Sequence, residues 1–189
     1  MRQACAAILI GFIATHTFAA GFEESLTKMG ETNLTSFASR SNDVCFRFTI
    51  LPTWGNPVCI RIQQDEKIFR LVAKRLEGEA GYRVGKLVET KERVLSERES
   101  KELLRSIDAL HFFEMPTTES NEDGRDGESW YLEGVQHGEF HKIERWTAGF
   151  ETKKRGLNEL VKFCALLVKF AELEEPPKNK GHEIFERNK

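Results

Sequence analysis

The sequence lacks an excess of charge of either sign. Its 28 lysines and arginines are mixed along the chain with 30 aspartates and glutamates, for a formal net charge of −2. A nucleic-acid-binding domain usually carries a basic patch or stripe, and this sequence has none. The apolar run near the N-terminus is shorter than the roughly 20 residues that span a bilayer. We therefore expect no nucleic acid as a partner and no stable membrane insertion of the mature chain.

The chain is also poor in cysteine, with four among 189 residues. A chain of this length fits one domain and can bury a core without disulfide staples. It has no internal repeat, and no Gly-x-Ser-x-Gly elbow surrounds Ser129, the hydroxyl nearest to the block discussed below. Its contents of 40% hydrophobic and 31% charged residues are those of an ordinary globular domain.

The first 20 residues have the pattern of a secretory signal peptide. Arg2 supplies the positive charge, residues 4–14 form the apolar segment, and small residues mark a cleavage site near Ala19 or Ala20. This pattern predicts that the mature chain is periplasmic or secreted.

The mature chain would keep three cysteines, so at least one thiol would form no intramolecular disulfide. Cys45 and Cys59 flank an expected hairpin loop and are a disulfide candidate, provided that their Cα atoms lie within about 7 Å. Cys164 falls on the apolar stripe of an expected helix, where a reduced cysteine behaves as a small core residue.

Residues 44–173 carry the periodicities of a single α+β domain. From Val44 to Leu51 apolar residues alternate with others in a period of two, which predicts a half-buried strand. Residues 21–43 are expected to form a flexible N-terminal arm, and residues 174–189 a disordered charged tail. Further strands are expected over 58–62, 67–76 and 86–95, and within a hairpin over 126–146.

Two helices are expected in the same domain. Ser96 and Glu99 have the spacing of a capping box, and an apolar helical repeat follows them until Pro116. A second helix is expected over about 156–173, where apolar residues recur on one face. The order of elements favours an antiparallel sheet of about six strands with both helices packed on one face. His111 is expected to cap or pack at the end of the first helix.

The block 126–146 concentrates aromatic and ionisable side chains in the expected hairpin. A two-residue turn that begins at His137 would leave Glu133 and His141 on opposite faces of the sheet. A three-residue loop over 136–138 would place Glu133 directly opposite His141. Histidine is not a favoured first residue of a type I′ turn, so the second register is preferred.

In the preferred register a carboxylate lies beside an imidazole, which suits general acid–base catalysis. The competing interpretation is a cross-strand polar pair worth about 0.2–1 kcal/mol. No third metal ligand accompanies the pair, so neither a metal nor a cofactor is expected. Trp54, Trp130 and Trp146 would offer an aromatic platform for carbohydrate or peptide. The catalytic candidates are Asp126, Glu133, His141 and Arg145, and the binding candidates in the block are Trp130, Tyr131 and Trp146.

Several short motifs together suggest a relationship: Arg47-Phe48-Thr49, Pro57, Gly81-Tyr82, Asp126-Gly127, Trp130, Glu133, His141 and Arg145-Trp146. With these motifs the chain resembles an uncharacterised family of small bacterial proteins over roughly residues 46–170. A proline expected shortly after the Arg-Trp pair is replaced by Thr147-Ala148, which implies a different loop after the hairpin. The resemblance implies a bacterial exported protein with an α+β fold, and it brings no activity.

Three functions remain open. The leading hypothesis is a non-catalytic domain that binds a protein or a cell-envelope ligand, because no complete catalytic set is present. The alternative is a hydrolase or metal-dependent enzyme that uses the Glu/His/Arg cluster on hairpin 128–146, and it requires these groups to converge. The third is a purely structural role, in which the cluster forms a buried polar network.

Overall fold

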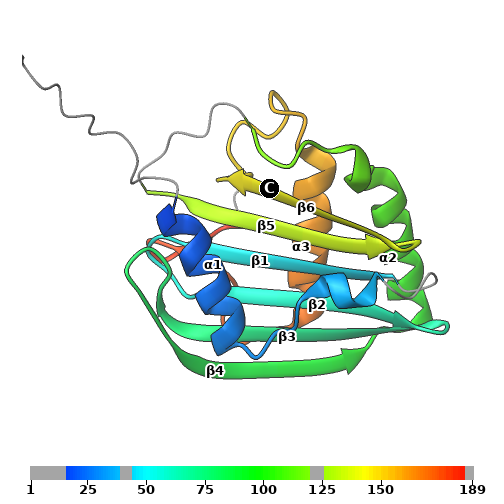
Figure 1. The fold of residues 1–189 in the computed structure, drawn as a ribbon, viewed down its shortest axis with the longest axis horizontal. Helices are drawn as coiled ribbons and strands as arrows, with labels where there is room; N and C mark the ends of the chain where they lie inside the picture. Colours follow the sequence, from blue (N-terminus) through cyan, green and yellow to red (C-terminus); the bar gives the residue numbers. More distant parts are fainter. Residues whose placement is uncertain (1–15, 39–43, 120–125, 186–189) are drawn as a thin grey trace, which may run out of the picture.

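The computed structural model describes residues 16–38, 44–119 and 126–185. Its main sheet has the strand order β4-β3-β2-β1-β5-β6, and every neighbouring pair is antiparallel. The predicted α+β fold with a six-stranded antiparallel sheet is therefore confirmed (Figure 1). The strands are β1 (Cys45–Pro52), β2 (Val58–Asp65), β3 (Ile68–Glu79), β4 (Arg83–Val94), β5 (Glu128–Gln136) and β6 (Glu139–Trp146).

Helices cover both faces of this sheet. As predicted, α2 (Glu97–Leu110) and α3 (Asn158–Ala171) pack together on one face. The helix α1 (His16–Lys28) lies across the other face (Figure 1). Within the described parts of the chain, no helix is both long and apolar enough to cross a membrane. The short elements are η1 (Leu34–Phe37), η2 (Phe112–Glu114), β7 (Lys178–Asn179) and β8 (His182–Glu183).

The start of α2 follows from its local sequence. The Ser96 hydroxyl accepts a hydrogen bond from the Glu99 amide (3.3 Å), and the Glu99 carboxylate accepts one from the Ser96 amide (2.8 Å). This is the predicted capping box, which satisfies two amide groups at the helix start. Arg93 on β4 donates two further hydrogen bonds to the same carboxylate, so the cap also ties α2 to the sheet.

Strand β1 is buried on both faces, although its alternating sequence predicted one wetter face. Its odd-numbered residues include Arg47, whose exposure is only 1%. The reason is α1 and the segment after it, which cover the face that would otherwise meet solvent. The central strand of this sheet therefore separates two cores, one under α2 and α3 and one under α1.

As far as residue 38, the N-terminal arm differs from its expected flexible state. Phe22, Leu26 and Met29 recur at helical spacing, and all three are buried against the sheet. Gly30 ends the helix with a φ of +63°, and the Glu31 amide donates back to Leu26 O (2.9 Å), as in a Schellman cap. A polar composition concealed this apolar stripe at the sequence level.

The C-terminal tail also differs from the expected disorder as far as residue 185. The strands β7 and β8 form a small hairpin, and Ile184 is buried. The Phe185 ring lies 5.1 Å from the Trp130 ring and 6.2 Å from the Phe48 ring. Two apolar residues within a charged segment thus anchor the tail at the edge of the main core.

Candidate functional site

The hairpin β5–β6 has the two-residue turn. Glu133 pairs with Lys142 and Gly134 pairs with His141, and the turn residues His137 and Gly138 have φ angles of +54° and +80°. Positive φ at both positions is the type I′ geometry. The preferred three-residue register is therefore wrong, and Glu133 and His141 point to opposite faces of the sheet.

Glu133 lies on the α1 face, where it is buried against Arg47 of β1. The Arg47 Nε and Nη2 atoms donate to Glu133 Oε2 at 2.7 Å and 2.6 Å. The remaining Arg47 nitrogen, Nη1, donates to Thr32 O (2.7 Å). The Glu133 carboxylate is therefore buried in an internal ion pair.

This ion pair belongs to a larger buried cluster around Glu31. Arg47 and Arg61 are direct cross-strand partners, an arrangement that is unfavourable for two like charges. The Glu31 carboxylate relieves it by lying 2.9 Å from Arg61 Nε and 3.7 Å from Arg47 Nη1, and it also contacts Lys74 Nζ at 2.7 Å. The segment after α1 is therefore held to the sheet by charge as well as by apolar packing.

The cluster changes the acidity of its members. Burial alone would raise the pKa of Glu31, but the hydrogen bonds and charges of Lys74 and Arg61 more than offset it, so the pKa is lowered. Burial, reinforced by the negative charge of Glu31, raises the pKa of the Cys59 thiol to about 12. Cys59 is thus an inert core thiol rather than a nucleophile.

His141 lies on the α2 and α3 face. Its Nε2 atom is 2.8 Å from Met115 O, and its ring packs on Phe112 and Phe113 at centroid distances of 5.0 Å and 6.2 Å. Arg145, on the same face, donates to Pro116 O (2.6 Å) and to Thr117 O (3.1 Å). These two predicted site residues therefore hold the segment from η2 to Thr117 against the sheet.

The other predicted residues do not converge with them. Asp126 accepts a hydrogen bond from Trp54 Nε1 (3.2 Å) and pairs with Lys180 Nζ (3.0 Å) near the C-terminal end of β1. Trp130 is 2% exposed and packs inside the main core. Tyr131 is buried on the opposite face, where its hydroxyl donates to Glu144 Oε1 (2.9 Å).

Trp146 is half-buried, with its ring close to Gly127. Because Trp130 lies inside the core on the other face, the expected platform of three tryptophans does not form. The Trp54 ring instead packs against the Tyr82 ring. The sequence did not predict this contact, because only the three tryptophans were expected to come together.

Cys45 and Cys59 form no disulfide, so that prediction is wrong. The cross-strand partner of Cys59 is Thr49, which is four residues from Cys45 along β1. At roughly 3.3 Å per residue the two cysteines are about 13 Å apart, well beyond the reach of a disulfide of about 7 Å. Cys164 is a reduced core residue of α3, as expected.

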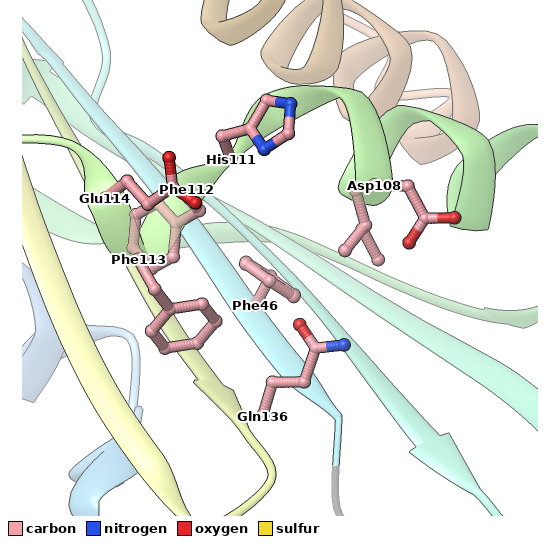
Figure 2. A pocket seen from close by; sticks show the side chains of 8 residues that line it. Phe46, Asp108, His111, Phe112, Phe113, Glu114 and Gln136 are labelled. Carbon is pink, nitrogen blue, oxygen red and sulfur yellow. The ribbon is translucent and has the colours of Figure 1, made fainter.

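The segment that His141 and Arg145 hold in place forms the walls of two cavities, which share His111 and Glu114. The first, of about 180 Å³, has an apolar floor that includes Phe46 and Phe112. Figure 2 shows Asp108 and His111 extending from the C-terminal end of α2, and Gln136 extending from β5.

The second cavity, of about 300 Å³, lies between η2 and the start of α3. Leu110, Leu157 and Leu160 form its apolar part. Its charged part contains Glu119, which pairs with Arg155. We call the two cavities together the His111 groove.

The rim of the His111 groove is polar. His111 is the left-handed cap of α2 as expected (φ +47°), but its side chain is exposed rather than packed. Asp108 and Glu114 are also exposed, and their carboxylates make no hydrogen bond or ion pair with any other described residue. Across the described parts of the chain, no three His, Cys, Asp or Glu side chains are grouped as metal ligands would be.

Asp108 and Glu114 are rim residues that the sequence did not predict. Both looked like ordinary exposed acids of a helix end, and only the fold places them beside a cavity. The aromatic pair at 112–113 was the available signal, because both rings line the first cavity.

No family model, curated protein or solved structure matches this chain. The resemblance to a family of small bacterial exported proteins therefore stays a prediction.

Proposed function

We propose that this protein is a non-catalytic binding domain whose ligand is a short segment of another protein, held in the His111 groove. The observation that carries the proposal is the pair of cavities that share His111 and Glu114, beside the Asp108 and Glu114 carboxylates, which pair with no other residue in the part of the chain that the structure describes. The segment would present an apolar side chain next to a basic one.

The size of the first cavity supports a peptide segment over a small molecule or cofactor. Pockets for drug-sized ligands commonly measure about 300–1,000 Å³, and the first cavity, of about 180 Å³, is below that range. Its aromatic floor suits one apolar side chain, which is how anchor residues of protein partners bind. The second cavity can take a neighbouring side chain of the same segment.

The charge of the rim supports a basic residue in the ligand. Asp108 and Glu114 line the first cavity, and none of its other described lining residues is a lysine or an arginine. In the second cavity the arginines are already engaged with carbonyl and carboxylate groups, Arg145 with Pro116 and Arg155 with Glu119. A cation beside the anchor would therefore meet carboxylates that need no rearrangement to pair with it.

The placement of the predicted catalytic residues argues against the enzymatic alternative. A Glu133–His141 acid–base pair requires both groups at one substrate, whereas the register separates them by the thickness of the sheet. Their internal contacts support the third hypothesis for these residues, a structural role. Turnover of an envelope substrate that disappears in His141→Ala, but not in a variant outside the hairpin, would revive the alternative.

We also propose that the protein is exported, because its first 20 residues have the pattern of a signal peptide. Cleavage near Ala19 or Ala20 would cut within α1 but would keep Phe22 and Leu26, which pack on the sheet. Intact-mass measurement of the full chain, recovered from the periplasm of an expressing bacterium, should give a start at Ala20 or Gly21. Recovery of the uncleaved chain from the cytoplasm alone would contradict export.

The binding proposal is tested with a phage-displayed library of random dodecapeptides panned against the purified protein. Enriched peptides should carry Lys or Arg beside an aliphatic or aromatic residue. In calorimetry, Asp108→Lys and Glu114→Lys should each raise the Kd of such a peptide about tenfold, equivalent to about 1.4 kcal/mol. Glu23→Lys is the matched control, since Glu23 is an exposed acid on α1 across the sheet.

Two results would contradict the proposal. One is a selection that enriches no common motif, and the other is a peptide whose affinity is the same for the wild type and the Glu114→Lys variant. Thermal melting of each variant checks that the fold is intact, because a lost fold would also lose binding.

A further inference from the structure

A second surface of interest lies at the C-terminal end of β1, away from the first cavity. The Trp54 and Tyr82 rings approach to a centroid distance of 4.5 Å with an interplanar angle of 42°. Tyr82 is 64% exposed, so much of its ring is accessible to a ligand. We call this pair the Trp54–Tyr82 platform.

Two segments that are distant in sequence hold Trp54 in place, one at Asn179 and Lys180 and the other at Asp126. Its amide donates to Asn179 Oδ1 (3.2 Å), its carbonyl accepts from the Lys180 amide (3.3 Å), and its indole Nε1 donates to Asp126 Oδ1 (3.2 Å). Asn179 is buried and also donates to Glu128 Oε2 (3.0 Å). The ring is therefore fixed before any ligand arrives, which lowers the entropic cost of binding.

Close backbone approach fixes the neighbouring turn as well. The Gly81 amide donates to Thr53 O (3.3 Å), and a Cβ at Gly81 would lie 2.8 Å from Thr53 Cγ2. A Cβ at Gly55 would collide with Lys178 O. Only glycine allows these loops to pack so tightly, and the packing brings Tyr82 against Trp54.

A hollow of about 480 Å³ adjoins Tyr82, within the size range of ligand pockets of about 300–1,000 Å³. Glu79 and Arg83 line it from facing positions on β3 and β4. Both side chains are exposed, and neither makes a hydrogen bond or ion pair with another described residue. The hollow thus offers one acceptor group and one donor group of opposite charge beside an aromatic surface.

We propose that the Trp54–Tyr82 platform and this hollow bind a neutral saccharide, with a pyranose ring against the aromatic side chains. The C–H face of a pyranose is apolar and packs on an aromatic ring, while each hydroxyl both donates and accepts hydrogen bonds. A carboxylate and a guanidinium together match that dual character. An anionic or cationic ligand would satisfy one of the two groups and be repelled by the other.

This inference is independent of the proposed function, because it uses other residues at another place on the sheet. A free oligosaccharide and an envelope polymer both present the same ring chemistry. Two kinds of probe separate these sources: soluble chitohexaose, cellohexaose and maltohexaose in calorimetry, and purified peptidoglycan sacculi in co-sedimentation.

We expect the full-length protein to bind at least one of these probes, with little dependence on ionic strength because the ligand is neutral. Tyr82→Ala should raise the Kd by about tenfold or more, and Tyr82→Phe should leave it near the wild-type value because the ring remains. Phe150→Ala is the matched control, since Phe150 is also 64% exposed but lies elsewhere.

The two charged residues give the sharper test. For a neutral saccharide, Glu79→Gln and Arg83→Gln should both weaken binding, whereas for an ion one of them would strengthen it. Binding to a soluble sugar supports recognition of the ring alone, and binding only to sacculi supports a polymer ligand. Absence of binding to every probe at about 10 mM sugar, or an equal Kd in Tyr82→Ala and the wild type, would overturn the proposal.

Discussion

Replacement of Glu133 by alanine should lower the free energy of unfolding by about 3 kcal/mol, and the reason lies in the partner left behind. Removal of one member of a buried ion pair typically costs about 3–5 kcal/mol. Arg47 would stay buried after the substitution. It would keep its hydrogen bond to Thr32 O and the carboxylate of Glu31 at 3.7 Å, so we expect the lower end of that range.

The measurement is urea unfolding followed by far-ultraviolet circular dichroism, with extrapolation to zero denaturant. For a domain of this size, 3 kcal/mol corresponds to a fall in Tm of about 6–12 °C. Glu24→Ala is the matched control because Glu24 pairs with Lys28 (2.8 Å) at the exposed surface of α1. That pair should contribute only about 0.3–0.5 kcal/mol.

A double variant, Arg47→Met with Glu133→Leu, separates the lost charge pair from the orphaned charge. It should be more stable than Glu133→Ala alone, because no buried guanidinium then lacks its main partner. The reasoning is refuted if Glu133→Ala loses less than about 1 kcal/mol, or if the double variant is the less stable of the two.

Three further predictions concern the same two cores. The pKa of Glu31 is lowered by its basic neighbours despite burial, so its contribution to stability is present above the unfolded pKa near 4.5 and is lost as the pH falls through the folded pKa. The free energy of unfolding should therefore fall less steeply with acid in Glu31→Gln than in the wild type, and parallel curves for the two proteins would contradict this. Because the pKa of Cys59 is raised to about 12 by burial, Cys59 of the native protein at pH 8 should react with a thiol reagent only after denaturant is added. Rapid native labelling at Cys59 would be inconsistent with this prediction. A Cβ at Gly134 would lie 2.6 Å from Phe112 Cε1 and 2.7 Å from Phe46 Cε1, so Gly134→Ala should lose about 1–3 kcal/mol in urea unfolding, and an unchanged stability would refute the overpacking argument.

Elements set by short-range chemistry could be predicted from the sequence. The capping box at Ser96 and Glu99 uses residues three apart, and the alternation in β1 needs no knowledge of its neighbours. Such patterns follow from helix and strand geometry, which repeats within a few residues. The same holds for Cys164, whose place on an apolar helical stripe predicted its burial.

The hairpin register shows where local chemistry was insufficient. Turn preference alone disfavoured His137 at a left-handed position, yet the protein accepts it (φ +54°). That register keeps Glu133 beside Arg47 on one face and His141 beside the aromatic residues on the other. The burial of many side chains on two faces outweighs the strain of one turn residue.

The sequence by itself determined the α+β class, the order of the six strands along the chain and two of the helices. Each of these depends on a pattern of apolar residues that repeats within a few positions along the chain. Only the tertiary structure decided which faces are buried, since Glu31, in the segment after α1, reaches Arg47 and Arg61 from outside the expected domain. It also decided which side chains meet at the surface. The Trp54–Tyr82 platform needs four segments to pack together, and contacts between distant segments leave no periodic trace in the chain.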